Sequence, residues 1–236
     1  MTGTILRKDL ATLWASPLPY LTGAAFHAVL AVLVVDQLQG RGQAVVQPLF
    51  PIAGFLLLLV VPLLTMRAFA EEARSGTLDL LLVAPVPGSA LAAGKWLAAW
   101  LSTLVVVAPA ATYVVLIALW GEPDLGPAVA GFVGLALLAA AVAGIGVLAS
   151  ALTTSQPVAA MVTVFGVLVL WFADRGDAAL SAGSTLARVS LSERFRLFAG
   201  GAIGAADAAW FLAVGVGAVV LAAAAVGMRR SPGSGR

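Results

Sequence analysis

The fold of this chain is decided by a charged segment, Arg67-Ala-Phe-Ala-Glu-Glu-Ala-Arg-Ser-Gly-Thr-Leu-Asp-Leu-Leu-Leu-Val-Ala-Pro-Val-Pro87, that stands between two long apolar runs at 48–66 and 96–120. The apolar runs are continuous, which indicates helices that cross lipid, where the backbone must satisfy its own hydrogen bonds. The charged segment between them must therefore face water, and its glycine and prolines divide it into short pieces. We expect it to be the working surface of the protein.

The composition of the whole chain points to an all-α, polytopic membrane protein. Hydrophobic residues make up 61% and charged residues 10%, whereas soluble domains are about one quarter charged. A membrane-crossing helix needs about 20 mainly apolar residues. Six stretches qualify, the fifth being the shortest: 18–35, 48–66, 96–120, 127–150, 157–173 and 208–228. We predict one transmembrane domain over residues 1–230 and a flexible tail over 231–236, which is rich in Gly and Ser.

The distribution of charge predicts how the spans are oriented. If the N-terminus is cytoplasmic, six spans return the C-terminus to the same side, and eight basic residues lie inside against five outside. Basic residues concentrate on the cytoplasmic side of membrane proteins. The sequence therefore predicts a multi-pass protein of the cytoplasmic membrane with both termini in the cytoplasm.

The segments next to the spans have recognisable helix signals. Leu6, Leu10, Leu13 and Trp14 are spaced as on one helix face, which predicts a helix in the membrane interface before the first span. The alternative is that these residues simply extend that span. On the other side of the bilayer, apolar residues of 191–198 recur at helical spacing and predict an amphipathic helix at the outer interface, ended by glycines at 200–201.

Within the charged segment, we expect the second span to continue as a polar helix that breaks at Ser75-Gly76. Thr77 is suited to cap a short apolar turn, and Ser89 to cap the next helix. Lys95-Trp96 is typical of re-entry at the membrane interface. The prediction is a helix–break–helix that leaves the membrane and returns to it.

The spans themselves offer little chemistry. The chain has no cysteine, and its one histidine, His27, lies in a span without a second ligand or relay partner, which favours a neutral imidazole hydrogen-bonded to a neighbouring helix. Gly94-Lys95-Trp96 lacks the glycine spacing and the hydroxyl of a nucleotide-binding loop, so any ATP must be handled by another chain. We expect no enzyme activity, no cofactor, no metal and no nucleic-acid partner.

Two features within the spans concern helix packing. The small residues Gly146 and Ser150 permit close approach of another helix, either within the chain or in a dimer. Pro109 is expected to bend the third span.

The charged segment also carries a resemblance. Phe69-Ala-Glu-Glu72, then Ser75-Gly-Thr-Leu-Asp-Leu-Leu-Leu-Val-Ala-Pro-Val86 and Gly94-Lys95, resemble ABC-2 type permeases, in particular the six-span permeases of the gliding-motility and nitrous-oxide-reductase-maturation type. The resemblance covers most of the chain, including Arg7-Lys-Asp-Leu10 near its start. The sequence departs from that pattern at Asp79, where Glu is common, and at Ala199, where a basic residue is frequent.

This resemblance implies a permease subunit whose loop between spans two and three docks on a separate ABC ATP-binding subunit. The implied coupling residues are Glu71, Glu72, Arg74, Gly76, Thr77 and Asp79. Such a complex pairs two ATP-binding subunits with two permeases, either two copies of this chain or one copy and a homologous permease. The few charges in the spans favour a hydrophobic or amphipathic cargo.

Two other functions stay open at this point. One is a membrane scaffold or assembly factor that anchors an ATPase without a conventional cargo. The other is a stand-alone channel or membrane enzyme, against which the lack of catalytic residues and of pore charges argues.

Overall fold

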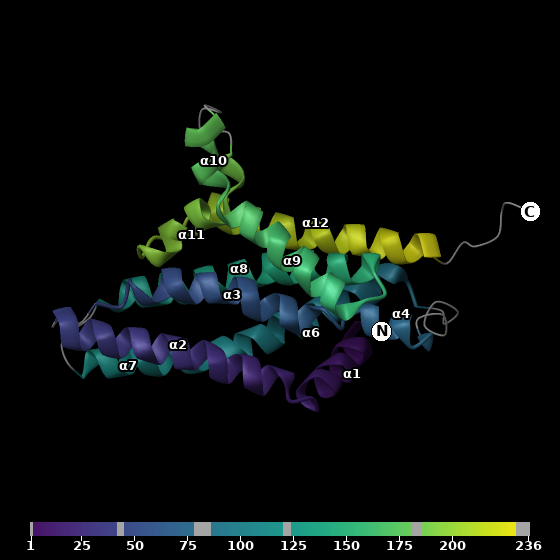
Figure 1. Cartoon of the computed structure of the whole chain (residues 1–236), viewed down its shortest axis with the longest axis horizontal. Coiled ribbons are helices and arrows are strands. Elements are labelled where there is room, and N and C mark those ends of the chain that lie inside the picture. Colours follow the sequence, from purple (N-terminus) through teal and green to yellow (C-terminus); the bar gives the residue numbers. More distant parts are fainter. Residues whose placement is uncertain (1, 42–44, 78–85, 120–123, 181–185, 230–236) are drawn as a thin grey trace, which may run out of the picture.

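A computed structural model describes residues 2–41, 45–77, 86–119, 124–180 and 186–229. Within these ranges the regular structure is entirely helical (Figure 1). The elements are α1 (Thr2–Trp14), α2 (Leu18–Arg41), α3 (Leu49–Thr65), α4 (Ala70–Arg74), α6 (Gly88–Val107), the 3₁₀ turn η1 (Ala108–Ala110), α7 (Ala111–Ala118), α8 (Leu125–Leu152), α9 (Gln156–Trp171), α10 (Ala173–Leu180), η2 (Ala187–Val189), α11 (Leu191–Ala199) and α12 (Ala205–Arg229).

All six predicted apolar runs form helices. In the described part of the chain, five helical stretches are long and apolar enough to cross a membrane: Leu18–Asp36, Leu49–Arg74, Gly88–Ala118, Leu125–Leu152 and Ala205–Met228. The fifth predicted run forms α9, which is apolar but has only 16 residues. The third begins earlier than expected, at Gly88, and the predicted bend at Pro109 is confirmed because η1 separates α6 from α7.

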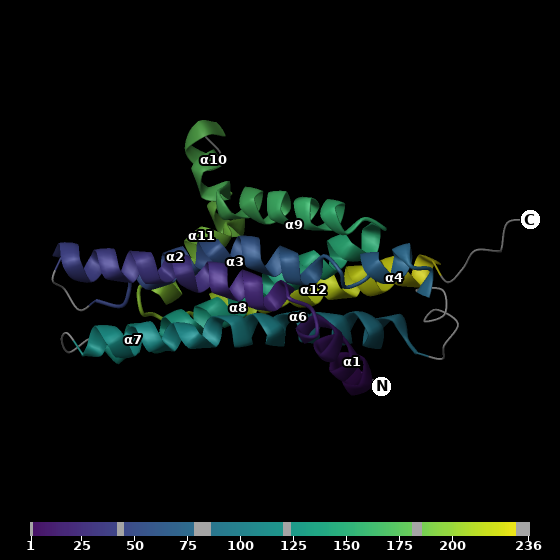
Figure 2. The same ribbon diagram turned by 60° about the horizontal axis from the view of Figure 1, so that its bottom comes forward.

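Helix α8 lies at the centre of the bundle and packs against α3, α6, α9, α11 and α12. Its small side chains allow this. A Cβ added at Gly144 would lie 2.5 Å from the carbonyl oxygen of Gly215 on α12, so these two helices meet almost backbone to backbone. Helix α9 lies at the periphery, as the turned view in Figure 2 shows. Most of the apolar residues on its outer face are exposed, as expected for a surface that meets lipid.

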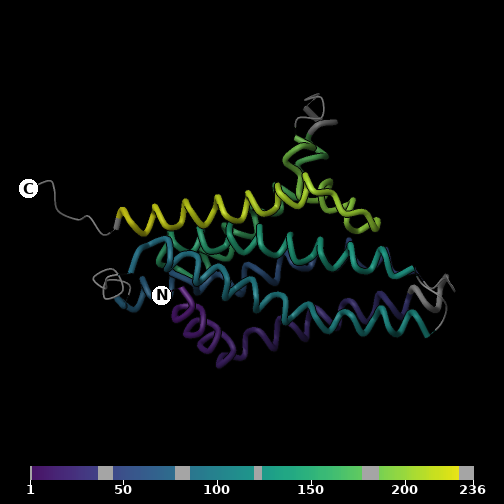
Figure 3. The backbone as a smooth tube through the Cα atoms, turned by 180° about the vertical axis from the view of Figure 1, so that it is seen from behind, coloured from purple at the N-terminus to yellow at the C-terminus, as the bar shows by residue number. Residues whose placement is uncertain are grey.

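One end of the bundle gathers α1, α4 and the C-terminal end of α12 (Figures 1 and 3). Helix α1 ends at Trp14, and α2 begins only at Leu18, so α1 is a separate helix and not an extension of the first span. It packs on α6, where the Trp14 indole N–H donates to Ser102 Oγ at 3.1 Å. The predicted N-terminal helix is therefore present, and it lies beside α4.

The amphipathic helix predicted near residue 195 is α11, but it does not use its apolar face as expected. Leu191, Phe195 and Phe198 are fully buried against the bundle, so this face is covered by protein and not by the outer interface. Arg194, which interrupts the apolar stripe, pairs with Asp207 at 2.7 Å. The predicted glycine ending is confirmed, because the residue at 201 has a φ of 100°.

Candidate functional site

The charged segment begins with a break that is held by another helix. Helix α3 ends at Thr65 and α4 starts at Ala70, so the polar helix does not continue α3 directly as predicted. The buried hydroxyl of Ser150 on α8 forms hydrogen bonds to the backbone between these two helices. It accepts hydrogen bonds from the backbone N–H groups of Phe69 and Ala70 and donates one to the carbonyl of Met66, each at 3.0 Å. These backbone groups would otherwise lack partners at the two helix ends.

Close packing of α8 brings this hydroxyl into place. A Cβ added at Gly146, one turn before Ser150, would overlap Thr65 Oγ1. Glycine therefore lets α8 reach the last turn of α3. Of the two interpretations of the small residues Gly146 and Ser150, packing within the chain is the one that the structure supports, and it ties α4 to α8.

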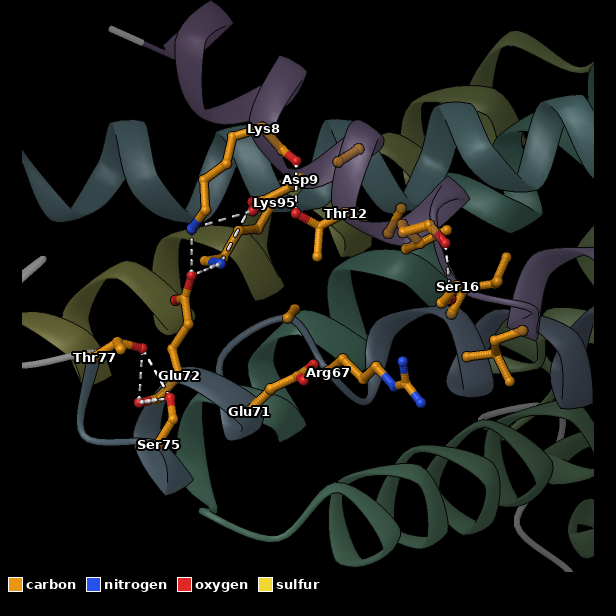
Figure 4. Close-up of a pocket in the computed structure, with 16 residues that line it drawn as sticks. Lys8, Asp9, Thr12, Ser16, Arg67, Glu71, Glu72, Ser75, Thr77 and Lys95 are labelled. Carbon is orange, nitrogen blue, oxygen red and sulfur yellow. Dashed lines mark hydrogen bonds and ion pairs between the residues drawn. The ribbon is translucent and has the colours of Figure 1, made fainter.

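A cluster of four charged side chains, which we call the charged cluster, ties α4 to two further helices (Figure 4). Glu72 Oε1 of α4 lies 2.9 Å from Lys8 Nζ of α1 and 2.9 Å from Lys95 Nζ of α6. Asp9 of α1 completes the cluster, with its carboxylate 3.4 Å from Lys95 and 3.8 Å from Lys8. Two ammonium groups thus alternate with two carboxylates, and three helices meet at one point.

Burial makes these charges depend on one another. The Lys95 side chain is only 3% exposed, and its ammonium lies 5.1 Å from the centre of the Phe69 ring. An ammonium removed from water to this extent requires carboxylate partners. Removing one partner of such a pair is costly, because the other charge stays buried and uncompensated.

The pKa values of two members of the charged cluster reflect this setting. Burial raises the pKa of the Asp9 carboxyl above its ordinary value, and the neighbouring Lys95 and Lys8 oppose that rise without cancelling it. Burial lowers the pKa of Lys8, but its hydrogen bond to Glu72 and the attraction of that carboxylate outweigh the effect, so the pKa ends above its ordinary value. The pairing with Glu72 therefore favours the charged form of Lys8.

Beside the charged cluster lies a cavity of about 260 Å³ between α1, α6 and the α3–α4 turn (Figure 4). Its lining is polar at the charged cluster and apolar toward Leu13, Leu18 and Leu64. Arg67 and Glu71 also line it. Two buried carboxylate oxygens in this region, Asp9 Oδ2 and Glu72 Oε2, accept no hydrogen bond within the part of the chain that the structure describes.

Beyond the charged cluster, α4 ends in a solvent-exposed surface. Its members are Glu71, Arg74, Ser75, Gly76 and Thr77, which we call the polar tip. The break expected at Ser75-Gly76 is present, because α4 ends at Arg74 and Gly76 has a φ of 72°, a backbone conformation that favours glycine. The Ser75 and Thr77 hydroxyls lie 2.9 Å apart, and Ser75 also donates to the Glu72 carbonyl.

The structure separates the six predicted coupling residues into two groups. Glu71, Arg74, Gly76 and Thr77 belong to the polar tip, whereas Glu72 turns inward, its side chain 13% exposed, and pairs within the chain. Glu72 is therefore already paired within the chain, and its role as a coupling residue stays a prediction. Asp79 and the turn that Thr77 was expected to cap lie outside the described residues.

One expectation about the far end of the charged segment, the cap at Ser89, is corrected. Helix α6 begins at Gly88 with Pro87 as its N-cap, so Ser89 is not the cap. The fixed φ of proline and its lack of an N–H suit the start of a helix. Lys95 lies seven residues into α6 and is buried against protein, and its place at the point of membrane re-entry stays a prediction.

Sequence reasoning missed four residues of the site: Lys8, Asp9, Lys95 and Ser150. A signal for the ion pair was available. Glu72 and Lys95 flank successive antiparallel spans, whose adjoining ends lie close together. An ion pair between this acid and this base could therefore have been predicted. Nothing in the sequence showed that α1 folds back onto the same point.

Elsewhere in the bundle, the one histidine makes the expected hydrogen bond to a neighbouring helix. His27 Nε2 donates to the carbonyl of Val106 on α6 at 2.8 Å, and the Tyr113 hydroxyl donates to the His27 carbonyl. Among the described residues, no group of three His, Asp or Glu side chains is placed to hold a metal ion.

Comparison with known proteins identifies a family for most of the chain. The family model described as "ABC-2 family transporter protein" matches residues 9–189, which include α4, the polar tip and most of the charged cluster. No curated protein matches the chain.

Proposed function

The chain belongs to the ABC-2 transporter family, and from that membership we propose that it is the permease subunit of a complex in which a separate ABC ATP-binding subunit hydrolyses ATP. The observation that carries the proposal is the family match over residues 9–189. The polar tip supports it, since it is an exposed, charged surface fixed to the membrane helices. Charged groups of both signs on such a surface suit recognition of a soluble protein.

We place the ATP-binding subunit on the polar tip, with Glu71, Arg74, Gly76 and Thr77 as its contacts, and Asp79 with them. Docking there would move α4, and three attachments would pass the motion on. Glu72 would transmit the motion to α6 through its ion pair with Lys95 and to α1 through its ion pair with Lys8. The Ser150 hydroxyl would transmit it to α8 through its hydrogen bonds to the backbone between α3 and α4. A rigid element with several packed attachments can move helices as a unit.

Contacts between α6 and α8 support transmission of this motion from α6 into the bundle. Trp96 and Trp100 of α6 stack on each other, with ring centres 5.9 Å apart. Their indole N–H groups donate to the carbonyls of Ala140 and Ala136 on α8, each at 2.9 Å. A tilt of α6 would therefore carry α8, the central helix, with it.

The complex that we propose contains two ATP-binding subunits and two permeases, either two copies of this chain or one copy and a homologous permease, with the pathway between them. It lies in the cytoplasmic membrane with both termini and the polar tip in the cytoplasm. The cargo is hydrophobic or amphipathic, because the spans carry few charges. Native mass spectrometry of the purified complex tests the composition; one permease with one ATP-binding subunit would contradict it.

The docking proposal is tested by charge reversal at the polar tip. The full chain would be expressed with a candidate ABC ATP-binding subunit, and copurification and ATPase activity would be measured in lipid nanodiscs. The double variant Glu71→Lys, Arg74→Glu should lose both. Glu72 is left unchanged, because its reversal would place a third ammonium group beside Lys8 and Lys95.

The matched control is Arg196→Glu on α11, a 73% exposed residue outside the polar tip. It should leave binding and turnover unchanged. Normal binding and normal ATPase activity in the double variant would place the docking surface elsewhere. Retained binding with an ATPase rate that no apolar or amphipathic cargo alters would favour the alternative, a scaffold that anchors an ATPase without a conventional cargo.

A further inference from the structure

The N-terminal helix has a second face that the charged cluster does not use. Arg7, Leu10, Ala11 and Trp14 follow one another at intervals of three, one and three residues. Residues so spaced lie on one side of a helix. Asp9 and Thr12, which line the cavity at the charged cluster, fall on the opposite side. Helix α1 therefore separates two different sites.

The second face of α1 borders an open apolar groove of about 720 Å³ along α6. The groove is lined by Leu10, Ala11 and Trp14 of α1 and by Leu101, Leu104, Val105 and Ala108 of α6 and η1. The Trp14 indole N–H is already bonded to Ser102. The lining thus offers hydrocarbon and no free hydrogen-bond donor, which suits an alkyl chain.

The position of the groove in the bundle fits a lipid. Trp14 packs edge-on against Tyr20, with ring centres 5.4 Å apart, and such aromatic residues favour the membrane–water interface. Helix α6 runs away from the end that holds α1 and α4 (Figure 3), and the groove residues of α6 lie in its second half. The groove therefore begins near the interface and leads toward the middle of the bilayer.

Arg7 supplies a charge at the interfacial end of this face. Its side chain is exposed, and in the described ranges it makes none of the ion pairs that hold its neighbour Lys8. A free guanidinium one turn from the groove can bind a phosphate through two parallel hydrogen bonds. The apolar groove and the cation together match the two halves of one molecule.

We propose that this groove binds an anionic phospholipid from the leaflet at this end of the bundle, with one acyl chain between α1 and α6 and the phosphate on Arg7. Such a lipid would cover the side of α1 that faces away from the charged cluster. The proposal does not depend on the identity of the ATPase or of the cargo.

Native mass spectrometry of the full-length protein, released from nanodiscs that contain equal amounts of phosphatidylglycerol and phosphatidylcholine, tests this site. The unmodified protein should retain phosphatidylglycerol in preference. Arg7→Gln should bring the two lipids to parity, and Arg7→Lys should keep part of the preference. Because Arg7 is exposed and makes no ion pair with the described residues, these variants are expected to fold normally.

A second variant tests the groove. Val105→Trp, at a 55% exposed position, should fill it and reduce retention of both lipids. The control is Val169→Trp on α9, at a 70% exposed position outside the groove, which should retain lipid as the unmodified protein does. An unchanged lipid preference in Arg7→Gln, or unchanged retention in a folded Val105→Trp, would overturn the proposal.

Discussion

The carboxylate of Glu72 on α4 lies 2.9 Å from the ammonium of Lys95, which is buried in α6. This ion pair connects α4, which carries the exposed polar tip, to the buried face of α6. Because the same Glu72 oxygen also lies 2.9 Å from Lys8 Nζ, a displacement of α4 acts on two helices at once.

The first prediction concerns this pair. Glu72→Gln should lower the free energy of unfolding by about 1.5–3 kcal/mol, the range for hydrogen bonds to charged groups, since Asp9 still offers Lys95 a carboxylate. Glu71→Gln, at the exposed neighbouring position, should change it by less than about 0.5 kcal/mol. Thermal or denaturant unfolding of the purified protein in detergent compares the two, and equal stability of the variants would contradict the assigned pairing.

The second prediction concerns the Ser150 hydroxyl. Ser150→Ala leaves the buried N–H groups of Phe69 and Ala70 without a partner, at a cost of about 1–3 kcal/mol. It should also weaken the attachment of α4 to α8, so that the ATPase activity of the ATP-binding subunit depends less on the presence of the permease. The control Thr154→Ala removes a hydroxyl from an exposed residue just beyond the end of α8. Hydrogen exchange of the 66–70 backbone reports the effect directly; unchanged protection there would show that Ser150 does not hold the break.

Most of the fold could be predicted from the sequence, because hydrophobic length alone identifies helices that cross lipid. The bend at Pro109 and the break at Gly76 also followed, since proline and glycine have local backbone consequences that do not depend on the rest of the structure. The hydrogen bond of His27 to a neighbouring helix was also predicted, because the spans offer the imidazole no ionisable partner.

The site was harder to predict because it depends on contacts between distant segments. Glu72 and Lys95 looked like surface charges, and only the return of α1 to the same end of the bundle buries them together. The apolar face of α11 pointed to an interface, but periodicity does not show whether protein or lipid covers it. Ser150 was interpreted as a small packing residue, because no pattern in the sequence indicates that the break between α3 and α4 lies opposite it.

The third prediction tests the close approach of α3 and α8. Gly146→Ala places a Cβ where Thr65 Oγ1 stands, and overpacking of this kind costs about 1–3 kcal/mol. Gly166→Ala on α9 is the control, because a Cβ there meets nothing within 4 Å. It should be neutral or slightly stabilising. The measurement is the midpoint of thermal unfolding, and a Gly146→Ala protein as stable as the Gly166→Ala protein would contradict the packing.

The last prediction is a pH dependence that originates at Asp9. Burial raises the pKa of this carboxyl above its ordinary value of 3.8, so the folded chain binds this proton more tightly than the unfolded chain does. The stability that Asp9 contributes is therefore fully present below pH 3.8 and is lost as the pH rises through the raised folded pKa. Asp9→Asn cannot titrate and should lack this loss. The difference in Tm between the original protein and Asp9→Asn should thus shift against the original protein as the pH rises through that window.

Lys95 opposes the rise in the Asp9 pKa, so Lys95→Met should extend the loss of stability to higher pH. Parallel Tm curves for the original protein and Asp9→Asn from below pH 3.8 to neutrality would show that the carboxyl does not titrate differently on folding.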